Sequence, residues 1–80
     1  MTSIRQKNVA LRPDLKAIGR RIREIRGFDL KQAQLAKVLG VTQTQLSKYE
    51  RGKSVPTVEI LLKLKDFSGK SIEWIVTGEG

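Results

Sequence analysis

Residues 42–53 (TQTQLSKYERGK) gather side chains that can hydrogen-bond to the edges of nucleic-acid bases. The amide of Gln both donates and accepts, which matches N6 and N7 of adenine, whereas Lys and Arg donate to the two acceptors of guanine. If the segment is helical, Leu46 and Tyr49 lie together on one side of it. The opposite side carries hydroxyl and cationic groups, from Thr44, Ser47, Lys48 and Arg51. Such a face predicts contact with the base edges of DNA.

We expect two kinds of DNA contact from this region. A good bidentate hydrogen bond discriminates between bases by about 1–3 kcal/mol, whereas phosphate contacts set the register and the salt dependence of binding. Gln45 and Ser47 suit either kind of contact, and a merely solvated helix face is the alternative for the whole set. The expected base contacts are Gln43, Thr44, Ser47 and Lys48. The expected phosphate contacts are Lys31, Gln45, Arg51 and Lys53.

The charge of the chain also indicates a polyanionic partner. The 80 residues hold 16 Lys and Arg against 8 Asp and Glu, so the formal net charge is +8. Residues 1–53 carry thirteen basic and four acidic side chains, whereas residues 54–80 carry three and four. We therefore expect the C-terminal third of the chain to face away from the polyanion.

The composition argues against catalysis and against metal binding. The sequence contains no Cys and no His, which removes the common zinc ligands, thiol nucleophiles and imidazole bases. No Gly-rich phosphate-binding loop precedes a Lys-Ser pair. No apolar run approaches the length of a membrane-spanning helix. We expect no enzymatic activity, no cofactor and no metal, and a cytoplasmic location in association with the nucleoid.

Five helices are predicted to position these side chains, and no strand pattern occurs. Capping residues mark the expected starts, at Asp14 (after Pro13), Asp29, Thr42, Thr57 and Ser71. Glycines mark the expected ends, at Gly27, Gly40, Gly52, Gly69 and Gly78. The predicted fold is all-α, a compact five-helix domain over residues 14–80 in which the second helix and the third (about 42–52) form a helix-turn-helix. Residues 1–13 are expected to form a flexible basic arm, either solvated or reaching along DNA.

Apolar residues at helical spacing predict the core. The expected members are Ile22, Leu35, Ala36, Val38, Leu39, Leu46, Tyr49, Leu61, Phe67 and Trp74. The last helix is too short to bury all three of its apolar residues other than Trp74 within one subunit. One of its faces is expected to complete the core, and Ile72 and Val76 are expected to meet a second subunit.

Four segments together resemble the helix-turn-helix domain of lambdoid phage repressors and Cro proteins, the Xre-like regulators. They are residues 18–26 (IGRRIREIR), 32–41 (QAQLAKVLGV), 42–53 (TQTQLSKYERGK) and 71–80 (SIEWIVTGEG), with Pro56-Thr57 ahead of the fourth helix. The resemblance covers about residues 15–80. It implies a lambda-repressor-like five-helix domain whose third helix enters the major groove and which acts as a dimer on a palindromic operator.

The resemblance also implies roles for single residues. Gln32 corresponds to the glutamine at the start of the second helix that contacts backbone phosphate and supports the third helix. The base-reading positions of the recognition helix correspond to Gln43, Thr44 and Lys48.

Two further correspondences concern the end of the recognition helix. Arg51 and Lys53 correspond to positions that clamp the DNA backbone. Glu50 corresponds to an acidic residue that pairs with an arginine of the first helix, for which Arg26 is the candidate. The connection between Arg26 and Leu30 is one residue shorter than the commonest form in the family.

The predicted function is sequence-specific binding of double-stranded DNA by a transcriptional regulator, as a homodimeric repressor. The alternative is an antitoxin of a toxin–antitoxin pair, which binds a toxin as well as its own operator. A third class, a basic binder of membrane surfaces, would need the apolar stripe of the first helix to be free. The matching apolar stripes of the other helices indicate that this stripe is buried, so no membrane partner is expected.

Overall fold

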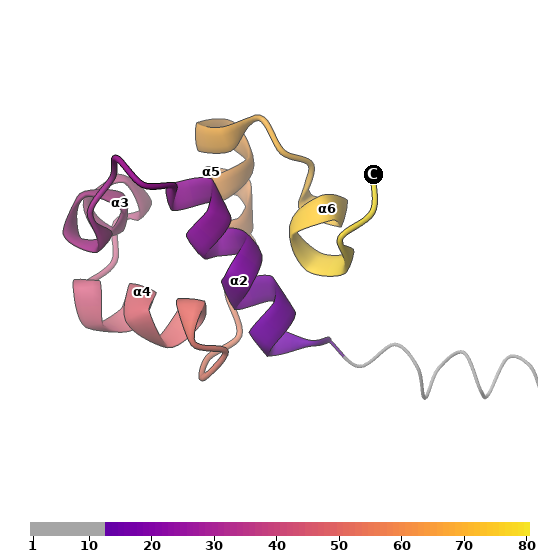
Figure 1. Ribbon diagram of the computed structural model, residues 1–80, viewed down its shortest axis with the longest axis horizontal. Helices are drawn as coiled ribbons and strands as arrows, with labels where there is room; N and C mark the ends of the chain where they lie inside the picture. Colours follow the sequence, from indigo (N-terminus) through magenta and orange to yellow (C-terminus); the bar gives the residue numbers. More distant parts are fainter. Residues whose placement is uncertain (1–12) are drawn as a thin grey trace, which may run out of the picture.

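The computed structural model describes residues 13–80, and within this range the chain forms five helices and no strand. The helices, labelled as in Figure 1, are α2 (Leu15–Arg26), α3 (Gln32–Leu39), α4 (Gln43–Glu50), α5 (Val58–Ser68) and α6 (Ile72–Thr77). The predicted all-α, five-helix fold is therefore confirmed. The expected arm lies outside the described residues, apart from Pro13. Among the helices of residues 13–80, none has the length and apolar character needed to cross a membrane.

Side-chain caps begin four of the helices, as the sequence predicts. In each case a hydroxyl or carboxylate oxygen accepts a hydrogen bond from the backbone N–H three residues later. The caps are Asp14, Thr42, Thr57 and Ser71, with donor–acceptor distances of 2.9–3.2 Å. Each such cap stabilises its helix by about 1 kcal/mol, because it satisfies a backbone donor that the helix itself leaves free.

The start of α3 differs from the prediction, because Asp29 is not its cap. Lys31 precedes α3 instead, and its backbone N–H donates to Oε1 of Gln34 at 2.8 Å. A capping box has two hydrogen bonds, one accepted by the side chain of the cap and one donated by its backbone N–H. A lysine side chain has no acceptor, so only the bond from the backbone N–H can form here. Arg26 Nη1 donates to the carbonyl oxygen of Leu30 at 3.2 Å. That bond ties the end of the connection to α2, and α3 begins two residues later, at Gln32.

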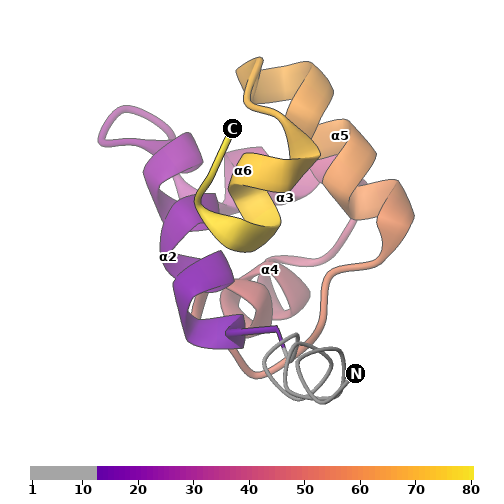
Figure 2. The same ribbon diagram turned by 90° about the vertical axis from the view of Figure 1, so that its right-hand side faces the viewer.

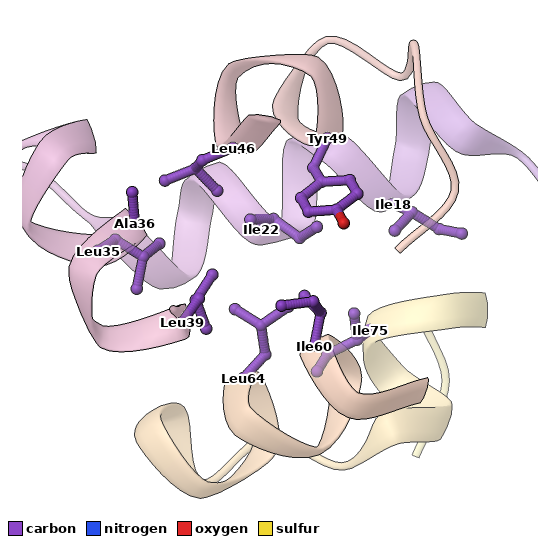
Figure 3. Packing of buried hydrophobic residues seen from close by; sticks show 10 residues of the cluster. All are labelled: Ile18, Ile22, Leu35, Ala36, Leu39, Leu46, Tyr49, Ile60, Leu64 and Ile75. Atoms are coloured by element: carbon purple, nitrogen blue, oxygen red, sulfur yellow. The ribbon is translucent and has the colours of Figure 1, made fainter. Parts of the chain in front are cut away.

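The helices surround one core, with α2 in the centre and α4 along one side (Figure 1). Helix α2 packs against α4, α5 and α6, while α3 packs against α4 and α5. Figure 3 shows the buried side chains meeting between the helices. They are Ile18, Ile22, Leu35, Ala36, Leu39, Leu46, Tyr49, Ile60, Leu64 and Ile75. Burying one such large side chain stabilises the fold by roughly 1.5–3 kcal/mol.

Two residues expected in the core lie at the surface, because Val38 is 49% exposed and Phe67 is 43% exposed. Helix α3 buries the stripe formed by Leu35, Ala36 and Leu39, and Val38 lies to one side of that stripe. Phe67 continues the buried stripe of α5 but lies in its last turn, beyond Leu64, the last residue of that helix to be buried.

Leu61 and Trp74 are only half-buried and pack against the edge of the core. The Nζ of Lys70 lies 5.0 Å from the centre of the Trp74 ring, which places a cation over the exposed part of the indole. The expectation of a core position is therefore met in part for both residues.

Gly19 lets α2 approach the end of α4. An added Cβ at this position would lie 2.6 Å from the carbonyl oxygen of Tyr49 and closer still to that of Glu50. Real Cβ atoms do not reach such distances. Because a glycine inside a helix is destabilising by about 1 kcal/mol relative to alanine, its presence here marks a packing requirement.

Candidate nucleic-acid interface

Helix α4 has one buried and one polar face. Leu46 is 0% exposed and Tyr49 is 5% exposed, and together they attach α4 to the core. The exposed side chains of the other face include three of the four predicted base contacts, Gln43, Thr44 and Lys48. Ser47, the fourth, is half-buried. The helix therefore presents hydrogen-bonding groups to solvent while its apolar residues hold it in place.

A shallow hollow of about 280 Å³ opens beside this polar face. It is lined by Gln32, Gln43, Thr44, Ser47 and Arg51. Three of these belong to the predicted base contacts and two to the predicted phosphate contacts, so the fold brings both kinds together. Lys48 does not line the hollow, although it shares the outward face of α4 with Thr44.

An ion pair ties the end of α4 to the end of α2. The Nε of Arg26 donates to Oε2 of Glu50 at 2.8 Å, and its Nη2 donates to Oε1 at 2.9 Å. The predicted pairing of Arg26 with Glu50 is thereby confirmed. The side chains are 17% and 5% exposed, so the pair is shielded from water. The hydrogen bond and the charge of Glu50 raise the pKa of the Arg26 guanidinium, while desolvation acts in the opposite direction.

Gln32 connects this ion pair to the start of α4. Its Nε2 donates to Oε1 of Glu50 at 3.1 Å, and its Oε1 accepts from Nε2 of Gln43 at 3.4 Å. Together with the ion pair, these bonds form a chain of contacts from Arg26 through Glu50 and Gln32 to Gln43. A side chain predicted to contact phosphate thus also holds a side chain predicted to contact a base.

The turn between α3 and α4 depends on Gly40. Its φ of 73° and ψ of 29° are left-handed, a conformation that glycine adopts without steric penalty. The backbone N–H of Val41 then donates to the carbonyl oxygen of Ala36 at 3.0 Å. The first turn of α3 lies at the hollow, because Gln32 is its first residue. Free N–H groups and the positive end of the helix dipole make such a terminus suitable for a phosphate.

The loop after α4 carries two exposed basic residues, Arg51 at the hollow and Lys53 after it, and packs against α2 through Gly52. Arg51 is exposed, and its Nε donates to the carbonyl oxygen of Ser47 at 3.3 Å. Gly52 has a φ of 73°, and an added Cβ would lie 2.9 Å from the backbone of Lys16. Lys53, the next residue, is exposed.

The remaining predicted contacts lie at the margins of this surface. Lys31 is exposed and adjoins Gln32. Gln45 is half-buried and lies outside the hollow, and its backbone N–H donates to the Thr42 cap.

Helix α6 divides its apolar residues between the core and the surface. Ile75 is 0% exposed and completes the core, whereas Ile72 and Val76 are half-buried. The Nη1 of Arg21 donates to the carbonyl oxygen of Ile75 at 2.9 Å, which attaches α6 to α2. Sequence patterning does not predict the bond from Arg21 to Ile75. It does not predict the role of Gly19 either, although a glycine inside an otherwise regular helix can indicate close packing.

Within residues 13–80, no group of three or more His, Cys, Asp or Glu side chains is placed to hold a metal ion. The chemistry that this surface offers is hydrogen bonding and positive charge.

Comparison with protein-family models gives a match to a helix-turn-helix family over residues 20–75. The HTH-type transcriptional activator BcrR of Enterococcus faecalis is 40% identical over 53 residues, which are 66% of this chain and 26% of BcrR. A putative HTH-type transcriptional regulatory protein of Pyrococcus abyssi is 37% identical over 51 residues, which are 60% of this chain and 16% of that protein. The chain thus spans about a quarter or less of the length of these relatives.

Two solved structures share the fold. The P22 c2 repressor, in complex with a synthetic operator, superposes with a TM-score of 0.71 at 33% identity, covering 78% of this chain and 96% of the repressor chain. The restriction-modification controller protein C.AhdI of Aeromonas hydrophila superposes with a TM-score of 0.68 at 28% identity, covering 78% of this chain and 96% of that protein.

Proposed function

The chain belongs to the Cro/C1-type helix-turn-helix family of DNA-binding transcriptional regulators, and from this premise we propose that it is a homodimeric repressor that reads a palindromic operator through α4. The observation that carries the proposal is the polar face of α4 and the adjoining hollow, which the ion pair of Arg26 and Glu50 and the side chain of Gln32 hold in place. The family is one of DNA-binding regulators rather than of enzymes.

We assign base recognition to the outward residues of α4. Gln43 offers an amide that can pair with adenine, the methyl group of Thr44 suits the methyl group of thymine, and Lys48 suits the acceptors of guanine. Ser47 adds a hydroxyl that donates or accepts. Three of these side chains are exposed, which supports the assignment, because they can enter a groove of DNA without any change in the core.

We assign phosphate contacts to residues around the same face, namely Lys31, Gln32, Gln45, Arg51 and Lys53. Support comes from the position of Gln32 at the first turn of α3 and from the exposure of Lys31, Arg51 and Lys53. Gln45 has the weakest support, because it is half-buried and outside the hollow. Each phosphate neutralised by a cation should contribute about −0.9 to the slope of log affinity against log salt concentration.

Ile72 and Val76 are the proposed contacts with the second subunit. A two-fold dimer of this kind would place its two recognition helices about 34 Å apart, one turn of DNA. The named relatives include an activator as well as a repressor. Repression is preferred because the P22 c2 repressor shares the fold at 33% identity in a structure that holds a synthetic operator.

Selection from a pool of random double-stranded DNA, followed by sequencing, tests the proposal directly. We expect enrichment of a palindrome whose half-sites are about one helical turn apart. Salt-sensitive binding without any enriched sequence would show that the net charge of +8 acts alone and would refute base recognition.

An antitoxin role is the second candidate. It is favoured by apolar side chains that are exposed away from the polar face of α4, above all by Phe28, which is fully exposed. In that role the domain would bind a toxin as well as its own operator. Recovery of a stoichiometric complex with a protein encoded beside it would support this candidate, and a chain that purifies alone from co-expression would oppose it.

A further inference from the structure

The outer face of α2 carries a line of cations that no other helix of the described residues covers. Lys16, Arg20 and Arg23 are exposed and recur at spacings of four and three, so they lie along one side of the helix. The buried residues of α2, which include Ile18, Gly19 and Ile22, lie on the other side. Figures 1 and 2 both show α2 with one flank open to solvent.

None of these cations forms an ion pair within the described residues, and Glu24 is the one carboxylate among the residues that line a hollow beside them. The ion pairs of residues 13–80 join Arg26 to Glu50 and Lys63 to Glu59, so none involves this line. Like charges three and four residues apart on a helix repel one another. A negatively charged partner would remove that repulsion, which gives the face a preference for acidic ligands.

An exposed aromatic ring lies at the C-terminal end of the same face. The side chain of Phe28 is fully exposed, so its ring contacts almost nothing in the fold. The connection that carries it projects from the body of the molecule in Figure 2, and the bond from Arg26 to the Leu30 carbonyl holds that connection. A hollow of about 600 Å³ separates the ring from the cations. It is lined by Arg20, Arg23, Glu24, Arg26, Gly27 and Phe28.

We propose that this surface, Lys16, Arg20, Arg23 and Phe28, docks an acidic segment of a partner protein that bears an apolar side chain. Guanidinium groups bind carboxylates through paired hydrogen bonds, and the ring of Phe28 with the hollow beside it takes the apolar group. Arginine and aromatic residues are also the types that dominate protein–protein contacts. A phosphate backbone would satisfy the cations but would offer Phe28 no apolar partner. Most of the surface lies on α2 rather than on the proposed DNA-reading face, but Lys16 adjoins the loop between Arg51 and Lys53, so DNA binding has to be measured beside peptide binding.

The test is affinity selection of the full chain against a displayed library of random peptides, followed by binding measurements with the enriched peptides. The test variants are Phe28→Ser and the double change Arg20→Glu with Arg23→Glu. Val58→Ser, at a residue that is 71% exposed on α5, is the matched control for Phe28→Ser. Lys37→Glu with Lys65→Glu, at exposed residues of α3 and α5, changes the net charge by as much as the double change does. Duplex DNA binding is measured for every variant in parallel.

We expect the enriched peptides to combine Asp or Glu with an aromatic or aliphatic residue. Both test variants should weaken their binding about tenfold or more, as loss of a central interface residue does, and the controls should not. DNA binding by Phe28→Ser should equal that of the unmodified chain.

Three results would overturn the proposal: no enriched peptide, enriched peptides without an acidic bias, or enriched peptides that Phe28→Ser binds as well as the unmodified chain does. If the double change weakened duplex DNA instead of the peptides, the cations of α2 would be phosphate contacts. Failure of the DNA-binding function itself would appear separately, as loss of DNA binding by the unmodified chain.

Discussion

At the scale of single residues, the outward face of α4 separates recognition of bases from attraction to the DNA backbone. Lys48→Ala should change the preferred base at one operator position, since it removes donors suited to guanine, at a difference of about 1–3 kcal/mol. Arg51→Ala and Lys53→Ala should weaken binding to all sequences similarly and reduce the salt slope by about 1 each. Binding titrations on an operator and its single-base variants at several salt concentrations measure both effects.

Lys65, exposed on α5, supplies the control for these changes, because its removal alters the net charge alone. If Lys48→Ala lowered affinity equally on every sequence, a role in base recognition would be wrong.

A second prediction at this scale concerns Glu50, which accepts from both Arg26 and Gln32. Glu50→Ala leaves the Arg26 guanidinium shielded and without its partner, so the free energy of unfolding should fall by about 1.5–3 kcal/mol. Denaturant unfolding of Glu50→Ala, Arg26→Ala and the double variant measures the coupling between the two residues. Additive single effects would mean that the ion pair contributes nothing beyond its separate parts.

At the scale of elements, the approach of α2 to α4 should be intolerant of even one methyl group. Gly19→Ala raises helix propensity but places a Cβ against the carbonyl oxygens of Tyr49 and Glu50, which cannot move independently of α4. We expect a net loss of about 1–3 kcal/mol, from thermal or denaturant unfolding. Gly69→Ala is a useful comparison, because its φ of 76° is strained for alanine although nothing lies near its Cβ. Equal or greater stability of Gly19→Ala would contradict the packing argument.

The elements themselves could be predicted from the sequence to a large extent, because their signals are local. Four caps and the glycine ends of α2, α3, α5 and α6 depend on residues within one turn of each helix boundary. Helix α4 ends earlier than predicted, at Glu50, and its C-cap is Arg51 rather than Gly52. The start of α3 was predicted wrongly because Lys31 has no side-chain acceptor to mark it, and the bond that forms there runs from the Lys31 backbone N–H to Gln34.

The exposure of Val38 and Phe67 was equally inaccessible to patterning. Helical spacing identifies an apolar stripe, but whether each member reaches the core depends on where the neighbouring helices end. For the candidate site, spacing and side-chain chemistry predicted residues that the fold does gather, including Gln43, Thr44 and Ser47 beside Gln32. The position of Gln45 outside the hollow follows from its place on α4 relative to α3, which no local signal reports.

At the scale of the whole molecule, the proposed assembly depends on the half-buried residues of α6. Ile72→Asp should convert a dimer into a monomer and weaken operator binding while the fold is retained, because Ile75 alone of the three fills the core. Sedimentation and helical circular dichroism measure the two properties independently. Val58→Asp places the same acidic group on the exposed side of α5 as a control. An unchanged dimer in Ile72→Asp would contradict an interface at α6. Loss of the dimer in Val58→Asp would mean that its disruption by an acidic residue is not specific to α6.

The two-faced character of α4 has a consequence for how such a protein can diverge. Only Leu46 and Tyr49 of this helix are buried, so Thr44 and Lys48 can be exchanged without touching the residues that hold the helix in place. Many substitutions are lost in evolution because they lower the free energy of unfolding below the value that function requires. Substitutions at these exposed positions change that free energy only slightly. A duplicated copy of this domain could therefore acquire a new target by a few substitutions while every intermediate along the way still folds.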